Sequence, residues 1–334
     1  MKKAIFRAWA ALLALLFLLG GCAGGPEEKD APILAANPLI RAVADADGAT
    51  CLLPGGDGVL ALWERDGGFS ASYVSAGKSA LTESLIAADG SPTGAGFLET
   101  ESGKGILAVG KRAWYLLLDG SGAEEKTLPG DVVFTGVCYR DEGFVCRKGS
   151  LLVLVPASLD DPLVLTDTDL FPGFGEVLTV TPDGKQIWFT KVDSSGKATA
   201  LAAFRPGDTK IDEEIPLLFD EALPAPEDRV LLIRTGGEET VFTLLNLSSK
   251  ETSSLTVPCG VEKPVLNAAA SRLAFWDRAA SKIRVYDFDA GEEIGVKDST
   301  DLGDAAALCY GGDGSLYASM RRDGSEILMT LARP

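Results

Sequence analysis

The sequence predicts an all-β protein, a seven-bladed β-propeller that follows a lipoprotein signal peptide, with six or eight blades as the alternatives. Three observations carry this prediction. Short apolar runs are separated by Gly, Asp, Pro and Ser turns about every 8–12 residues. No long segment shows the 3.6-residue apolar period of a helix. A polar turn followed by an apolar strand recurs about every 43 residues, which matches the ~40–45 residues of a four-stranded blade.

The recurrence is clearest between the two ends of the domain. Gly55–Leu60 reads GGDGVL and Gly311–Leu316 reads GGDGSL, and each is followed by Arg-Asp-Gly, beginning at Arg65 and Arg322. The turns of this kind are anchored at Asp57, Gly103, Glu142, Asp183, Glu227, Ser271 and Asp313. Seven anchors predict seven blades; a six-bladed ring requires one of them to be spurious, and Glu142 is the weakest.

The strands that follow these turns have the composition of buried strands. Val230–Ile233 and Leu273–Trp276 are apolar at every position, as expected for strands covered on both faces by neighbouring blades. The chain ends directly after the third strand of the last blade. We therefore expect the N-terminal segment Ile33–Val43 to supply the missing outer strand, which removes the exposed edge of the ring.

One repeat carries a resemblance to a known family. Thr181–Phe189, TPDGKQIWF, resembles the S-P-D-G-K-x-I-x-F repeat of WD40-like, TolB-type propellers. The resemblance implies that Asp183 and Gly184, after Pro182, form the tight turn between the first two strands of a blade. The other repeats are degenerate, so no subfamily follows. The equivalent structural turn residues of the first and last repeats are Asp57, Gly58, Asp313 and Gly314.

The N-terminus has the parts of an export signal. The cations Lys2, Lys3 and Arg7 are followed by the apolar stretch Ala8–Leu19, and Leu19-Gly20-Gly21-Cys22 resembles a lipobox. The resemblance implies cleavage before Cys22 and attachment of lipid, with acyl chains such as palmitate, to that cysteine. The predicted organisation is a signal peptide at 1–21, a flexible tether at 22–37 and the propeller at 38–334.

The alternative is an uncleaved signal anchor, because 18 uncharged residues reach the lower limit for a membrane span. Both interpretations place the domain on the extracytoplasmic face of the cell membrane. In a Gram-negative host, the outer membrane is a second destination.

The charge balance narrows the partners. The chain contains 31 Lys and Arg against 48 Asp and Glu, a net charge of −17. Such a surface repels phosphate backbones, so nucleic acid is excluded as a partner. It also disfavours docking on anionic lipid, which makes a covalent anchor on Cys22 more important.

The sequence offers little catalytic equipment. It contains no histidine, which excludes Ser-His-Asp and Cys-His nucleophiles and removes the commonest zinc and copper ligand. Gly77-Lys78-Ser79, Asp45–Gly48 and Asp287–Asp289 are fragments of phosphate or calcium loops that are better explained as turns. We expect no cofactor, no metal and no catalytic residue. The densest acidic cluster is Asp160, Asp161, Asp167 and Asp169, which we interpret as a solvated loop.

Five cysteines remain beside Cys22, at positions 51, 138, 146, 259 and 309, which is too sparse for a disulfide framework. Cys138 and Cys146 are symmetric about Glu142. A tight turn there would set them opposite each other across a hairpin, where a disulfide is feasible. The alternative is that both are small buried side chains.

These observations favour a non-enzymatic, membrane-anchored lipoprotein whose propeller binds an envelope protein, a peptide or a glycan. A rigid ring fixes position while its loops supply specificity. Two alternatives stay open: a glycan-active enzyme that uses two carboxylates in an aromatic-lined channel, and a sensory or regulatory lipoprotein.

Overall fold

The computed structural model describes residues 32–41, 51–55, 58–65, 68–75, 78–87, 94–100, 103–109, 112–117, 123–127, 132–139, 142–323 and 325–332. One compact unit extends from Ile33 to Pro334. The regular secondary structure of its described residues consists of β-strands and a single 3-10 helix, η1, at Thr168–Leu170. In this described part, no helix has the length and apolarity needed to cross a membrane.

The strands form four-stranded antiparallel sheets, most of them from consecutive strands. The first two are β2 (Cys51–Gly55), β3 (Gly58–Arg65), β4 (Gly68–Ser75) and β5 (Lys78–Ala87), then β6 (Gly94–Thr100), β7 (Gly103–Val109), β8 (Arg112–Leu117) and β9 (Ala123–Thr127). The next two are β10 (Val132–Tyr139), β11 (Gly143–Lys148), β12 (Leu151–Pro156) and β13 (Leu163–Asp167), then β14 (Phe174–Val180), β15 (Ile187–Val192), β16 (Ala198–Phe204) and β17 (Glu213–Pro216). They are followed by β18 (Glu221–Ala225), β19 (Arg229–Gly236), β20 (Glu239–Asn246) and β21 (Thr252–Val257), then β22 (Glu262–Leu266), β23 (Arg272–Asp277), β24 (Lys282–Asp287) and β25 (Glu292–Asp298). The last sheet contains β26 (Asp304–Tyr310), β27 (Leu316–Arg322), β28 (Ser325–Ala332) and β1 (Ala35–Arg41).

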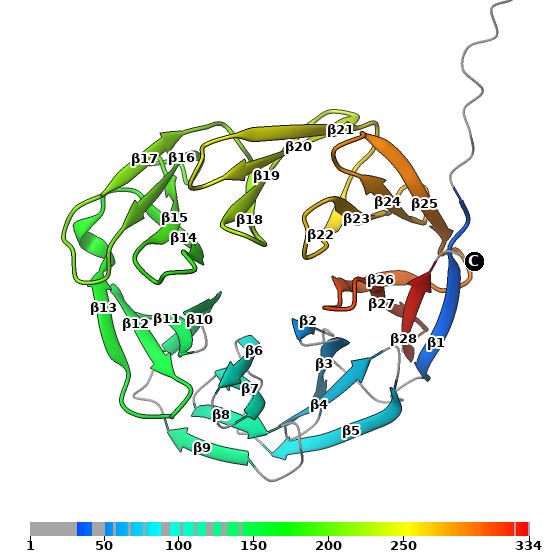
Figure 1. Cartoon of the computed structure of the whole chain (residues 1–334), viewed down its shortest axis with the longest axis horizontal. Helices are drawn as coiled ribbons and strands as arrows, with labels where there is room; N and C mark the ends of the chain where they lie inside the picture. The colour runs from blue at the N-terminus through cyan, green and yellow to red at the C-terminus, as the bar shows by residue number, and fades with distance from the viewer. Residues whose placement is uncertain are drawn as a thin grey trace, which may run out of the picture. The chain divides into compact units, whose positions relative to one another are not determined.

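The sheets of this unit are arranged around a common centre (Figure 1). In each of them the first strand of the repeat is innermost, so that β2, β6, β10, β14, β18, β22 and β26 surround the centre. This is the architecture of a β-propeller, and the all-β prediction is confirmed.

The blade count needs a correction. A packed blade is defined by side chains buried against its neighbours, whereas the spacing of turns counts only hairpins. Burial is described for most side chains in five blades, and five is therefore the number of packed blades supported in place of the expected seven. These blades are β10–β13, β14–β17, β18–β21, β22–β25 and β26–β28, the last completed by β1. Strands β2–β5 and β6–β9 form two further four-stranded sheets, so the described backbone contains seven sheets. Few side chains of these two sheets are described; among them, Leu52, Val59 and Ala61 pack against the last blade.

The core lies between blades. The second strand of a blade is buried on both faces, as in the run Val230–Ile233 of β19 and Leu273–Trp276 of β23. These two strands contribute to one cluster, in which Phe242 and Phe275 have ring centroids 6.1 Å apart. Comparable clusters join the other neighbouring blades whose side chains are described. The expectation from the apolar runs is confirmed.

The N-terminal segment closes the last blade. Strand β1 pairs antiparallel with β28, from Ala35↔Ala332 to Arg41↔Ile327. The two preceding residues reach the neighbouring blade: Ile33 forms a parallel bridge with Val296, and the N–H of Leu34 donates to the carbonyl of Val296 at 2.7 Å. The propeller therefore begins at Ile33, five residues before the predicted boundary at 38, because part of the predicted tether is a strand.

Candidate functional site

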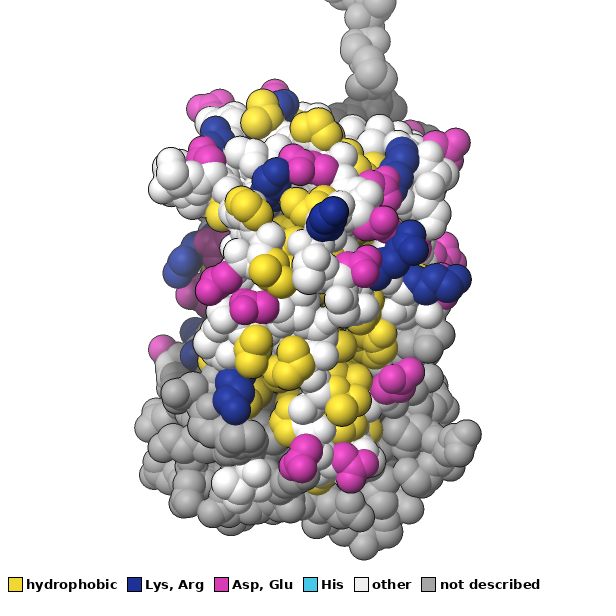
Figure 2. All heavy atoms as spheres, turned by 90° about the vertical axis from the view of Figure 1, so that its left-hand side faces the viewer, with side chains coloured by type: hydrophobic (Ala, Val, Ile, Leu, Met, Phe, Trp, Pro, Cys, Tyr) yellow, Lys and Arg dark blue, Asp and Glu magenta, His cyan; other side chains and the backbone are white. Residues whose placement is uncertain are grey.

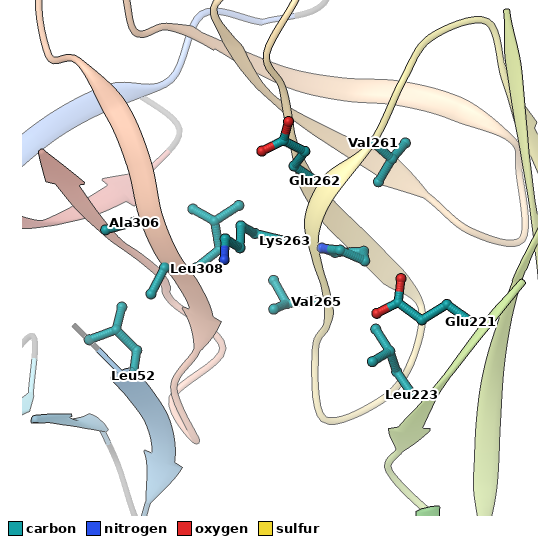
Figure 3. A pocket seen from close by; sticks show the side chains of 11 residues that line it. Leu52, Glu221, Leu223, Val261, Glu262, Lys263, Val265, Ala306 and Leu308 are labelled. Atoms are coloured by element: carbon teal, nitrogen blue, oxygen red, sulfur yellow. The ribbon is translucent and has the colours of Figure 1, made fainter. Parts of the chain in front are cut away.

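A cavity lies at the centre of the ring, between the innermost strands β18, β22, β26 and β2. Its volume is about 580 Å³, within the ~300–1,000 Å³ typical of ligand pockets. Figure 3 shows the side chains around it. The lining residues are Leu52, Glu221, Leu223, Val261, Glu262, Lys263, Pro264, Val265, Ala306, Ala307 and Leu308.

A second cavity of about 550 Å³ adjoins the first. The two share five lining residues: Leu52, Leu223, Pro264, Val265 and Leu308. Beyond these, the wall continues with Pro224, Ala225, Pro226, Leu231, Leu266, Ala268, Cys309, Tyr310, Gly311 and Gly312. The described wall is therefore one continuous and mainly aliphatic channel section, and its charged side chains gather in the first cavity.

Prolines in the inner strands disfavour backbone hydrogen bonding between the channel wall and a bound strand. Pro224 lies in β18 and Pro264 in β22, and the sequence places Pro54 in β2. A proline has no N–H, so an edge strand that contains one is a poor template for pairing with another strand. The wall therefore offers side-chain contacts more readily than backbone pairing.

Three charged side chains belong to the first cavity: Glu221, Glu262 and Lys263. Glu262 is paired, because Nη1 of Arg278 lies 3.6 Å from its Oε1, and Nη2 of the same arginine lies 3.5 Å from Oδ2 of Asp304. Within the described residues, neither Glu221 nor Lys263 has an ion pair. One free carboxylate and one free amine thus share an aliphatic cavity.

The described lining of the first cavity differs from the one expected of a glycan-active enzyme. Such a site pairs two carboxylates with aromatic rings that hold the sugar, whereas the first cavity has two glutamates and no aromatic residue. Tyr310, in the second cavity, is the aromatic residue nearest to it in the lining, and burial raises its pKa. Within the described residues no group of His, Cys, Asp and Glu is arranged to hold a metal ion.

The turn residues of the repeat lie between the first and second strands of their blades. In the turn after β14, Oδ1 of Asp183 accepts hydrogen bonds from Oγ1 of Thr181 at 2.8 Å and from the N–H of Lys185 at 3.0 Å. The ammonium of Lys185, which lies 2.8 Å from Oδ2 of Asp183, holds the pKa of Asp183 below its usual range together with these two hydrogen bonds. Pro182 and Gly184 complete the turn, and the N–H of Gly184 donates to the carbonyl of Thr181.

The last repeat builds the same turn after β26. Oδ1 of Asp313 accepts from the N–H of Ser315 at 2.9 Å, and the N–H of Gly314 donates to the carbonyl of Gly311. In the first repeat, Gly58 opens β3 and is buried, while Asp57 lies outside the described residues. These residues are structural, and the Asp and Gly at these positions shape the hairpin.

Cys138 and Cys146 do not face each other as expected. In the β10–β11 hairpin Cys138 pairs with Phe144, and Cys146 pairs with Phe134, because a register shift between Phe134 and Val137 displaces the strands. Both are thiols in this structure. Burial, reinforced by the neighbouring Cys138, raises the pKa of Cys146 to about 12, which suits the alternative of a buried small side chain.

Several other predicted features can be placed. Cys22, the signal peptide, Asp45–Gly48 and Gly77 lie outside the described residues. Asp287 accepts from the N–H groups of Asp289 and Ala290, as a turn residue does. The acidic cluster Asp160, Asp161, Asp167 and Asp169 lies around the exposed edge strand β13 and η1.

The outer face of the ring around β13 and β17 carries hydrophobic, acidic and basic side chains together (Figure 2). Figure 2 shows hydrophobic, acidic and basic groups interspersed over it. Its exposed apolar residues include Leu163 and Val164 of β13, Leu170 of η1 and Leu218 after β17. No large field of one charge sign is visible on this face, despite the net charge of −17.

The blade β22–β25 contains a partly buried ion-pair network that could not be predicted from the sequence. Asp277, at the end of β23, is 3% exposed. Its Oδ2 accepts from Nε of Arg284 at 2.9 Å, and Nη1 of Arg284 donates to Oε1 of Glu293 at 2.8 Å. Each of these residues is an ordinary turn or strand residue in the sequence, and only the pairing of β23, β24 and β25 brings them together.

Comparisons with known proteins support the architecture. No family model and no curated protein matches the sequence. The structure is similar to the β-propeller domain of Cps50 (Swd1) from Myceliophteria thermophila, with a TM-score of 0.61 and 10% identity over 89% of this chain and 99% of that one. It is also similar to the WD40 domain of Toxoplasma gondii coronin, with a TM-score of 0.55 and 11% identity over 91% and 87%. A third likeness is to Kuenenia stuttgartiensis hydrazine synthase, with a TM-score of 0.54 and 10% identity over 93% and 99%. At such identities the likeness shows the fold alone, and that fold is a WD40-like β-propeller.

Proposed function

We propose that this chain is a lipid-anchored, non-enzymatic binding protein on the extracytoplasmic face of a membrane, whose propeller receives an envelope protein or peptide at one mouth of its channel. The observation that carries the proposal is the continuous aliphatic wall formed by the two adjoining cavities between β18, β22, β26 and β2. Burying apolar ligand surface against such a wall is favourable without any catalytic group.

The wall also suits a partner that binds through its side chains rather than through backbone hydrogen bonds. Pro224 and Pro264 reduce backbone pairing along β18 and β22, while Leu223, Val265 and Leu308 present apolar surface to the cavity. A projecting loop or peptide can place aliphatic groups between these side chains. The rigid ring holds them in position, so little conformational entropy is lost on binding.

The anchoring part of the proposal is based on the N-terminal pattern. Lys2, Lys3 and Arg7 precede an apolar stretch, and Leu19-Gly20-Gly21-Cys22 resembles a lipobox. The TPDGKQIWF repeat adds a resemblance to TolB-type propellers, which is compatible with a place in the cell envelope. The function of a tethered binding module is to keep its partner close to the membrane.

Filling the cavity tests the binding site. Ala306 lines the first cavity and carries no side chain beyond Cβ, so Ala306→Trp is expected to occupy ligand space and to reduce partner capture from detergent-solubilised envelopes at least about tenfold. Quantitative mass spectrometry of cross-linked complexes measures the loss. The matched control is Ala279→Trp, which adds the same ring to an exposed turn. Equal capture by wild type and Ala306→Trp would rule out the channel as the binding site.

Removing the lipidation site tests the anchor. The Cys22→Ala variant is expected to lose incorporation of a clickable palmitate analogue completely, because no acyl chain can be attached, and to leave the membrane fraction if the signal is still cleaved. Gel fluorescence and fractionation measure the two effects. Cys51→Ala is the control, since a mature-domain cysteine should not affect labelling. Undiminished labelling of Cys22→Ala would contradict the anchor.

A further inference from the structure

Resting on the proposed function, we infer that the first cavity binds a short apolar peptide with both ends free. Its ammonium end would lie at Glu221, its carboxylate end at Lys263, and its aliphatic side chains between Leu223, Val265 and Leu308. Glu221 and Lys263 have no ion pair within the described residues, they lie on different sides of the cavity, and Lys263 has an unusual backbone conformation.

The pairing state singles out two of the three charged residues. Glu262 is held by Arg278. Glu221 and Lys263 have no ion pair within the described residues, although both line the same cavity.

The two charges approach the cavity from different sides. Figure 3 shows Lys263 reaching from β22 toward Ala306 and Leu308 of β26, while Glu221 extends from β18 on the opposite side. Aliphatic side chains form the wall around them, and an apolar wall strengthens electrostatic contacts because it lowers the local dielectric constant. A ligand that spans the cavity meets an anion at one end and a cation at the other.

The backbone at Lys263 is itself unusual. The β22–β23 register shifts between Glu262 and Val265, so Lys263 and Pro264 form a bulge, and Lys263 has a φ of 54°. Bulges beside functional sites re-aim side chains, and a left-handed conformation is costly for a residue other than glycine.

Blade β10–β13 provides the comparison. Its innermost strand also has a register shift, there with two extra residues, between Phe134 and Val137, and the left-handed residue in it is Gly136, with a φ of 86°. Glycine adopts this conformation without steric cost. Lys263 in the bulge of β22 has no such freedom, so its left-handed backbone carries a conformational cost.

Ligands with a single charge fit less well. The carboxylate of a fatty acid would pair with Lys263, but it would be repelled by Glu221 and Glu262, which line the same cavity. An aliphatic amine would satisfy Glu221 and leave Lys263 without a partner. A short apolar peptide satisfies both, and about 580 Å³ accommodates more than one aliphatic side chain.

The experiment measures binding of trileucine to the full-length protein in detergent by isothermal titration calorimetry, beside N-acetyl-trileucine and trileucine amide. Each capped form is expected to bind at least about tenfold more weakly, because one charge-assisted contact is lost. The Glu221→Gln variant should weaken trileucine to the same extent and become insensitive to the N-acetyl cap. The Lys263→Gln variant should become insensitive to the amide.

Further variants separate recognition from folding. Lys263→Gly removes the amine but relieves the left-handed backbone, so it should keep or raise the thermal midpoint while losing sensitivity to the amide. Lys210→Gln and Glu238→Gln, at exposed sites away from the channel, should bind all three peptides as the wild type does.

The outcomes distinguish this inference from the proposed function. If trileucine and its capped forms bind equally, or if none binds, the inference is wrong. The proposed function is judged separately, by whether Ala306→Trp abolishes partner capture. A residual amide effect in Lys263→Gly would assign the carboxylate to another cation and would also overturn the inference.

Discussion

Replacement of Asp277 by alanine is expected to lower the free energy of unfolding by about 1.5–3 kcal/mol, because it removes a charge-assisted hydrogen bond from a partly buried ion-pair network. Asp277 is 3% exposed, and its carboxylate contacts Nε of Arg284 at 2.9 Å. Its Oδ1 also accepts from the N–H of Ala280 at 3.1 Å and so fixes the turn between β23 and β24. The substitution removes both contacts and leaves Arg284 with Glu293 alone. Chemical denaturation followed by fluorescence measures the change.

A second substitution separates the contribution of the turn hydrogen bond to the free energy of unfolding from the contribution of the Asp277 charge. Asp277→Asn keeps an acceptor for the N–H of Ala280 but loses the negative charge, so it should cost less than Asp277→Ala. Asp183→Ala is the control, since it removes a turn aspartate with an exposed ion pair to Lys185, and exposed pairs contribute only about 0–1 kcal/mol. A loss below about 1 kcal/mol for Asp277→Ala would show that the network does not stabilise the fold.

Deletion of the closing strand is expected to have the second large effect. A chain that begins at Ala42 lacks β1 and leaves the edge of β28 unpaired, whereas a chain that begins at Pro32 keeps the whole closure. Losing the buried side chain of Leu34 alone costs about 2–5 kcal/mol. The shorter chain should therefore melt about 10 °C or more below the longer one, as differential scanning calorimetry will measure.

The exposed edge gives a second readout. The chain that begins at Ala42 should aggregate, because an unpaired strand is a template for pairing between molecules. A synthetic peptide with the sequence of residues 33–41 should restore the monomer by occupying that edge, and a scrambled peptide should not. Equal melting temperatures and a stable monomer without the peptide would contradict the role of β1 in closing the ring.

The sequence could predict the fold class, the turns and the closing strand, because these depend on local signals. The turn at Asp183 is encoded by adjacent residues, and the double-sided burial of Leu273–Trp276 follows from an unbroken apolar run. The need for a strand from the N-terminus followed from the point at which the last repeat ends. Each inference needed only the order of residues along one blade.

What could not be predicted depends on register or on packing between blades. The pairing of Cys146 with Phe134 results from a bulge that symmetry about Glu142 does not reveal. The channel combines residues of β2, β18, β22 and β26, which are distant in the sequence. The number of packed blades depends on side-chain burial between neighbouring sheets. The spacing of turns along the sequence counts hairpins and does not show this burial.

The attachment of Ile33 and Leu34 to Val296 has a mechanical consequence. Under the proposed anchoring, tension between the membrane and a bound partner enters the domain at Ile33. There the chain is fastened to β25 before it runs along β28, so a pull must first break contacts with one blade before it can peel the strand from another. Two blades thus resist the force, and the contacts with β25 protect the β1–β28 pair, at which the ring closes.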